Sequence, residues 1–147
     1  MSLQFENVKK ILVPTDGSDY SMRAAEYAVS VAKLLNAEVM VVYVIDVVVL
    51  DQMAKATEQD KVEAELKIDG DRYLKYILGM AQKQGVKATS LLTKGRPFAQ
   101  IVHLAKDLKM DLIVMGSYGR RGAERILIGS VAERVIEYAS CPVLVVH

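Results

Sequence analysis

Five short runs of β-branched and aliphatic residues alternate with longer segments of helical spacing. This alternation restricts the possible folds of the chain more than any other feature. The runs cover residues 10–13, 38–45, 87–92, 111–115 and 143–146. Most are continuously apolar, which is typical of strands covered on both faces. Strands joined by intervening helices run parallel through right-handed crossovers, so we predict a doubly wound α/β sheet with helices on both faces.

The segments between these runs repeat apolar residues at helical spacing. They are expected to form four helices, centred on residues 22–35, 62–81, 97–108 and 131–139. Gly70 and Gly79 weaken the second pattern, whereas Pro97 suits the first position of the third helix. Residues 46–62 mix apolar and charged side chains, and we predict a mobile loop there. Because no linker or low-complexity tract divides the sequence, residues 1–147 are expected to form one domain.

Composition and charge exclude several classes of function. The 147 residues carry a formal net charge of +1, which argues against nucleic-acid binding by bulk electrostatics. No apolar run approaches the roughly 20 residues of a membrane-spanning helix, and the N-terminus lacks the layout of a signal peptide. The single cysteine, Cys141, cannot form an internal disulfide, and a buried inert thiol is favoured over a reactive one. We expect a soluble, cytoplasmic protein with neither nucleic-acid nor membrane partners.

Ligands of doubly wound sheets bind at the carboxyl ends of the strands, where the direction of winding changes. Attention therefore falls on the turn after the first strand, residues 14–19. Ser18 or Asp19 can cap the next helix, and Gly17 can supply an unusual backbone angle. Asp16 lies at the end of the strand, where it is either a turn carboxylate or a ligand contact. Its position leaves both interpretations open.

Glycines cluster at two points beyond the fourth strand. Gly116 and Gly119 follow that strand, and Gly129 with Ser130 begins the last helix. Backbone amides freed of side chains can approach an anion, and a helix N-terminus offers further N–H groups and a positive dipole end. Ser130 and Glu133 also have the spacing of a capping box. The alternative is that these residues only form turns and caps.

The spacing Gly116-x2-Gly119-x9-Gly129-Ser130 resembles the ATP-binding signature of universal stress proteins. Residues 11–18 also resemble the opening strand and turn of that family, and residues 140–146 its closing strand. The resemblance spans essentially the whole chain. It implies a five-stranded parallel sheet in the order 3-2-1-4-5, the fold of adenine nucleotide alpha hydrolase-like proteins.

The resemblance also implies the ligand and its contacts. The adenine would meet Asp16 and Val44, with Pro14 and Thr15 nearby. The ribose and phosphates would contact Met115, Gly116, Gly119, Gly129, Ser130 and Val131. Arg120 is followed by Arg121 where the family often has a small or polar residue, and the pair either adds a phosphate contact or is solvated. The expected ligand is ATP, with AMP or another adenine nucleotide as alternatives, and Mg²⁺ or Mn²⁺ would enter through the phosphates. No protein metal ligand and no catalytic residue is assigned.

Enzyme classes that use ATP match the sequence less well. The chain has no Gly-x4-Gly-Lys-Ser/Thr loop. The turn at residues 15–19 only partly resembles the loop of ATP pyrophosphatases. His103 lies inside the third predicted helix, where a surface histidine is favoured over a catalytic one. The sequence therefore predicts a nucleotide-dependent regulatory or stress-response protein with little or no hydrolysis. A slow ATP hydrolase and an interaction module with a vestigial pocket are the alternatives.

The closing strand, Val143–Val146, contains no lysine or proline that would discourage pairing at a sheet edge. We expect a homodimer formed through this strand across a twofold axis. A further protein partner, not identified by the sequence, would read the nucleotide state.

Overall fold

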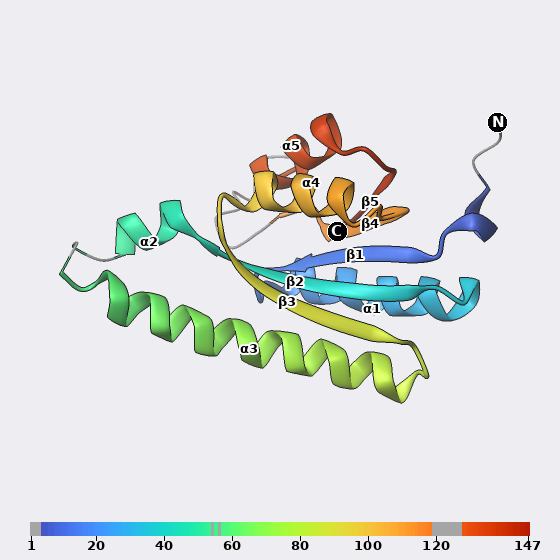
Figure 1. Cartoon of the computed structure of the whole chain (residues 1–147), viewed down its shortest axis with the longest axis horizontal. Coiled ribbons are helices and arrows are strands. Elements are labelled where there is room, and N and C mark those ends of the chain that lie inside the picture. The colour runs from blue at the N-terminus through green and yellow to red at the C-terminus, as the bar shows by residue number, and fades with distance from the viewer. Residues whose placement is uncertain (1–3, 54, 56, 119–127) are drawn as a thin grey trace.

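The computed structural model describes residues 4–53, 55, 57–118 and 128–147. Strands and helices alternate along the chain as the sequence predicts (Figure 1). The strands are β1 (Lys10–Thr15), β2 (Glu38–Asp46), β3 (Ala88–Gly95), β4 (Leu112–Gly116) and β5 (Val143–Val146). The helices are the 3-10 turn η1 (Phe5–Asn7), α1 (Asp19–Leu35), α2 (Val47–Met53), α3 (Gln59–Lys83), α4 (Pro97–Asp107) and α5 (Ser130–Tyr138). Within the described residues, no helix is both long enough and apolar enough to span a membrane.

The strands form one five-stranded sheet in the order β3-β2-β1-β4-β5, and every pairing is parallel. This confirms the order implied by the family resemblance. The chain winds outward from β1 to β3 and then returns to place β4 on the other side of β1. The direction of winding therefore changes between β1 and β4, which is where a sheet of this kind opens a crevice.

Helices cover both faces of the sheet. Helices α1 and α3 pack on one face, and α4 and α5 pack on the other (Figure 1). The side chains of β1 alternate between the two layers: Ile11 and Val13 contact the α1–α3 layer, whereas Leu12 contacts the α4–α5 layer. All three are fully buried. Burial on both faces explains why the central strands are continuously apolar.

The predicted mobile loop at residues 46–62 is wrong over most of its length. Helix α2 occupies Val47–Met53, and α3 already begins at Gln59. The carboxylate of Asp46 begins α2 by accepting hydrogen bonds from the backbone N–H groups of Val48 at 2.9 Å and Val49 at 3.4 Å. Leu50, only 3% exposed, anchors α2 to the core. The sequence pattern concealed this helix because it is short and has a single buried anchor.

Gly70 does not interrupt α3 as its helix propensity suggested. A Cβ at this position would lie 2.4 Å from the ring of Tyr43 on β2. The missing side chain lets the helix approach the sheet over that aromatic ring. Gly70 is therefore explained by packing.

Candidate functional site

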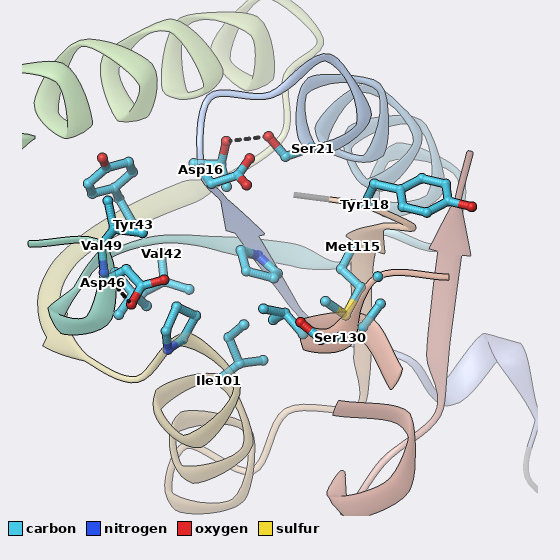
Figure 2. A pocket seen from close by; sticks show the side chains of 18 of the residues that line it. Asp16, Ser21, Val42, Tyr43, Asp46, Val49, Ile101, Met115, Tyr118 and Ser130 are labelled. Atoms are coloured by element: carbon cyan, nitrogen blue, oxygen red, sulfur yellow. Dashed lines mark hydrogen bonds between the residues drawn. The ribbon is translucent and has the colours of Figure 1, made fainter. Parts of the chain in front are cut away.

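A cavity of about 130 Å³ lies at the carboxyl ends of β1, β2 and β4. We call it the central cavity. Every predicted site residue within the described part of the chain lines it, and these residues are Pro14, Thr15, Asp16, Val44, Met115, Gly116, Gly129, Ser130 and Val131. Gly119 and Arg120 lie outside the described residues, so their predicted contacts stay predictions. Figure 2 shows Asp46 and Val49 on one side of the cavity and Met115 and Ser130 on the other.

The turn between β1 and α1 forms one wall. Of the two predicted candidates, Ser18 and not Asp19 is the N-cap of α1, and its hydroxyl accepts a hydrogen bond from the N–H of Ser21 at 3.3 Å. The carboxylate of Asp16 accepts one from the N–H of Ser18 at 2.9 Å. Gly17 has a φ of +82°, the unusual angle that its sequence position suggested. Asp16 therefore holds the turn and lines the cavity at once, so the two interpretations of this residue are compatible.

The hydroxyl of Thr15 completes this wall. It forms a 3.0 Å hydrogen bond with the hydroxyl of Ser21, and the Ser21 hydroxyl lies 2.9 Å from the carbonyl oxygen of Ser18. Thr15 is 4% exposed and Ser21 is 5% exposed. Because each hydroxyl has a protein partner, neither needs a ligand to satisfy it.

The part of the cavity next to α2, α3 and α4 is apolar. Its lining includes Val42, Val49, Leu66, Pro97 and Ile101. The sequence pattern did not indicate these residues. Val49 and Leu66 come from the region predicted as a loop and from the helix after it. Pro97 and Ile101 belong to the first turns of α4. The rule that ligands bind at the carboxyl ends of strands therefore does not predict them.

The opposite end of the cavity is built from the end of β4 and the start of α5. The N–H of Gly129 donates a 2.7 Å hydrogen bond to the carbonyl oxygen of Ser117, which joins the two elements. A Cβ at Gly129 would lie 3.0 Å from that oxygen and 3.3 Å from the Cα of Tyr118. The close approach therefore favours glycine at this position, which agrees with the alternative that this residue forms a turn. That preference does not exclude a contact with a ligand.

The predicted capping box of Ser130 and Glu133 is wrong. Helix α5 begins at Ser130, so its N-cap is Gly129, which has no side chain to accept a hydrogen bond. The first N–H groups of a helix have no intrahelical acceptor. Here the helix start lines a cavity and its N-cap residue, Gly129, supplies no side-chain cap, an arrangement suited to an anion.

Other chemistry-bearing groups lie elsewhere. His103 is exposed on α4, where its Nε2 lies 2.8 Å from the carboxylate of Asp107. Cys141 is a free, half-buried thiol, and burial raises its pKa, with the charge of Asp111 adding to the effect. In the part of the chain that the structure describes, no group of three or more His, Cys, Asp or Glu side chains could hold a metal ion.

The family model of the universal stress protein family matches residues 7–147. The chain belongs to the universal stress protein family. The universal stress protein MJ0531 of Methanocaldococcus jannaschii is 47% identical over 138 residues, covering 94% of this chain and 81% of that protein.

Solved structures of the family have the same fold. The structure of protein MJ0577 superposes with a TM-score of 0.84 at 32% identity, covering 95% of both chains. A universal stress protein in complex with cAMP has a TM-score of 0.69 at 26% identity, covering 95% of this chain and 97% of that one. One from Archaeoglobus fulgidus in complex with dAMP has a TM-score of 0.70 at 25% identity, covering 95% and 98%. Relatives with this fold therefore bind adenine nucleotides.

Proposed function

We propose that this universal stress protein binds ATP in the central cavity and acts as a nucleotide-dependent regulatory protein of the stress response. The observation that carries the proposal is the composition of the cavity. An apolar region beside α2, α3 and α4 is continuous with the uncapped N-terminus of α5. A nucleotide has the matching polarity, with an apolar base at one end and anionic phosphates at the other.

The base would lie at the apolar end. Val42 and Ile101 are buried there, with exposed fractions of 0% and 2%. Asp16 and Val44 line the same cavity from the ends of β1 and β2, where polar atoms can meet the edge of a purine. Apolar walls with a few placed polar groups are the usual composition of a small-molecule site.

The phosphates would lie against Gly129, Ser130 and Val131. Backbone N–H groups at a helix start donate charge-assisted hydrogen bonds of about 1.5–3 kcal/mol each, and the helix dipole adds about 0.3–2 kcal/mol. A few such bonds and burial of the base reach about 8 kcal/mol after the cost of association, which corresponds to micromolar affinity. Because backbone groups dominate, AMP or another adenine nucleotide is an alternative ligand.

A divalent ion would enter with the phosphates. The described residues contain no cluster of ligating side chains. Phosphate oxygens are hard ligands that Mg²⁺ and Mn²⁺ prefer, and Mg²⁺ commonly keeps several waters. The ion would neutralise phosphate charge, while the chain itself holds the nucleotide through its backbone.

The proposal includes a cytoplasmic homodimer of single-domain chains and a further protein partner that reads the nucleotide state. The edge position of β5 and its apolar sequence support the dimer. Slow hydrolysis of ATP is the alternative function. The second alternative is an interaction module whose cavity no longer binds nucleotide and which acts through its surface alone.

Ser130→Asp tests the proposal at the start of α5. Ser130 is exposed and occupies the first helical position, where an aspartate is favourable to the helix dipole. The variant should keep its thermal stability, yet lose at least tenfold in ATP affinity because the new carboxylate repels phosphate. Ser30→Asp is the matched control, since it adds the same charge on the exposed face of α1, across the sheet.

Titration calorimetry with ATP and Mg²⁺ measures the three proteins. Wild type and Ser30→Asp should bind alike. Equal affinity of Ser130→Asp would show that α5 does not hold the phosphates. Absence of binding by wild type at millimolar ATP would favour the surface-acting alternative. Mass spectrometry of the protein as purified would identify any nucleotide that it retains.

A further inference from the structure

One polar side chain in the central cavity has its hydrogen-bonding capacity unused. Ser117 is 0% exposed, and its Oγ has no hydrogen-bond partner among the described residues. Buried hydroxyl groups in proteins nearly always have a partner. Burying one without a partner destabilises the folded chain, so this hydroxyl needs a physical explanation.

Ser117 lies at the point where β4 ends and α5 begins beside it. Ile113 and Met115 pack in the α4–α5 layer. A Cβ on Gly116 would instead meet α1, at 2.8–2.9 Å from backbone atoms of Tyr20 and Ser21. Ser117 directly follows β4, and its carbonyl oxygen accepts the N–H of Gly129, so the residue lies beside the start of α5.

The backbone of Ser117 is already fixed. Its N–H donates a 2.9 Å hydrogen bond to the carbonyl oxygen of Val146, and its carbonyl oxygen accepts the 2.7 Å bond from Gly129. The residue is thus held on both sides, between β5 and the start of α5. These bonds fix the backbone of Ser117 and with it the direction of the Cα–Cβ bond.

The chemistry of the surrounding groups indicates what would satisfy the hydroxyl. The uncapped start of α5 offers N–H donors, and Ser117 offers an O–H donor beside them. A ligand that meets both must bring acceptor oxygens. A phosphoryl group carries several such oxygens and a negative charge that the helix N-terminus favours.

We infer that the Ser117 hydroxyl donates a hydrogen bond to a phosphoryl oxygen of the bound nucleotide and so selects phosphorylated ligands over the free nucleoside. The inference rests on the proposed function, because it assigns a new contact within the same cavity. Ser117 is fully buried, lies at the cavity and is paired with α5 through its backbone. Without a ligand the hydroxyl has no partner among the described residues, and the nucleotide would satisfy it.

The test compares Ser117→Ala with Ser21→Ala. Both substitutions remove one buried hydroxyl from the lining of the cavity, but the Ser21 hydroxyl has partners in Thr15 and Ser18. Without nucleotide, Ser117→Ala should raise the Tm by about 2–4 °C, because it removes an unsatisfied group. Ser21→Ala should lower the Tm, because it removes the hydrogen bonds of the Ser21 hydroxyl with Thr15 and Ser18.

Binding of ATP, ADP, AMP and adenosine is then measured by calorimetry. Ser117→Ala should lose about tenfold or more in affinity for ATP, as expected for a charge-assisted hydrogen bond, and keep the affinity of wild type for adenosine. The shortest nucleotide that loses affinity identifies the phosphoryl group contacted. Ser21→Ala should change the affinities for ATP and adenosine by the same factor.

Three results would overturn the inference: an unchanged ATP affinity in Ser117→Ala, an equal loss for adenosine, or a lowered Tm without nucleotide. The last would mean that the hydroxyl has a partner in the unliganded chain. Failure of the proposed function is a separate result, since wild type itself would then bind none of the four compounds.

Discussion

The end of β4 touches the first turn of α1 so closely that a Cβ on Gly116 would lie 2.8 Å from the backbone carbonyl carbon of Tyr20. The atoms it would meet include backbone atoms, which cannot rotate away as a flexible side chain can. Gly116 thus brings the turn after β1 and the turn after β4 together at the central cavity. Gly116, which the family resemblance places next to the ribose and phosphates, therefore also allows β4 to pack closely against α1.

Gly116→Ala should lower the free energy of unfolding by about 1–3 kcal/mol, the usual cost of inserting an atom into a packed site. Gly79→Ala is the control, because a Cβ at Gly79 in α3 would meet nothing within 4 Å. That variant should gain about 0.5–1 kcal/mol from helix propensity. Urea unfolding of both variants measures the difference. Equal stability of Gly116→Ala and wild type would show that β4 and α1 can separate without cost.

The hydrogen-bond pattern of β5 determines which residues could pair with a second chain. The carbonyl oxygens of Pro142 and Val146 accept hydrogen bonds from the N–H groups of Ile113 on β4 and of Ser117, the residue after β4. Alternate residues of a strand face the same neighbour, so Leu144 also faces β4. Val143 and Val145 therefore direct their backbone groups toward the free edge.

Val145→Pro should convert the proposed homodimer to a monomer, because proline removes an outward N–H donor while leaving the bonds to β4 in place. Sedimentation at tens of micromolar protein measures the mass, and circular dichroism checks the fold. Val145→Lys should act in the same direction by placing a charge at the edge. A wild-type chain that sediments as a monomer would contradict dimer formation through β5.

The fold could be predicted in large part from the sequence, for reasons visible in particular strands. Residues such as Ile11, Leu12 and Val13 are buried alternately against two layers, which leaves an unbroken apolar run. Periodicity alone could not order the strands, because the order depends on contacts between segments distant in sequence. That order came from the family resemblance.

Site residues could be predicted from the sequence where they follow the ends of predicted strands. They could not be predicted where their position depends on packing between elements. Asp16 lies in the turn after the first predicted strand, Gly116 directly follows the fourth, and Ser130 begins the last predicted helix. Val49 and Ser117 could not be found in this way. Val49 lies on a helix with a weak pattern, and the unsatisfied hydroxyl of Ser117 becomes apparent only when its neighbours are placed.

The Cys141 thiol leads to a prediction for how the stability of the folded chain depends on pH. Burial, with a smaller contribution from the charge of Asp111, raises its pKa in the folded chain. The thiol therefore contributes stability below its unfolded pKa of about 8.5, and this contribution is lost as the pH rises through the higher folded value. The stability advantage of wild type over Cys141→Ala should shrink above about pH 8.5 in urea unfolding. A constant difference from pH 7 to 10 would show that the folded thiol titrates normally.

The last prediction separates a binding protein from an enzyme. Fast hydrolysis of ATP needs a positioned water, a group to orient it and cationic charge on the transferring phosphoryl group. The N–H groups at the start of α5 bind the ground state and the transition state about equally, which gives affinity without rate. Asp16 lines the cavity, but its carboxylate holds the turn through Ser18. Glu124, the acidic residue of the glycine-flanked loop, lies outside the described residues.

Purified protein should therefore turn over ATP far more slowly than the median enzyme rate of about 10 per second, with either Mg²⁺ or Mn²⁺ present. Phosphate release is followed on wild type and on Ser130→Asp, which should bind ATP poorly and so reports contaminating activity. Turnover on the order of one per second in wild type, absent from Ser130→Asp, would make the protein an enzyme and Glu124 the first residue to substitute. Equal, slow release from both proteins, with binding intact in wild type, would support a nucleotide-dependent regulator, because the cavity would then hold ATP without a group that activates water.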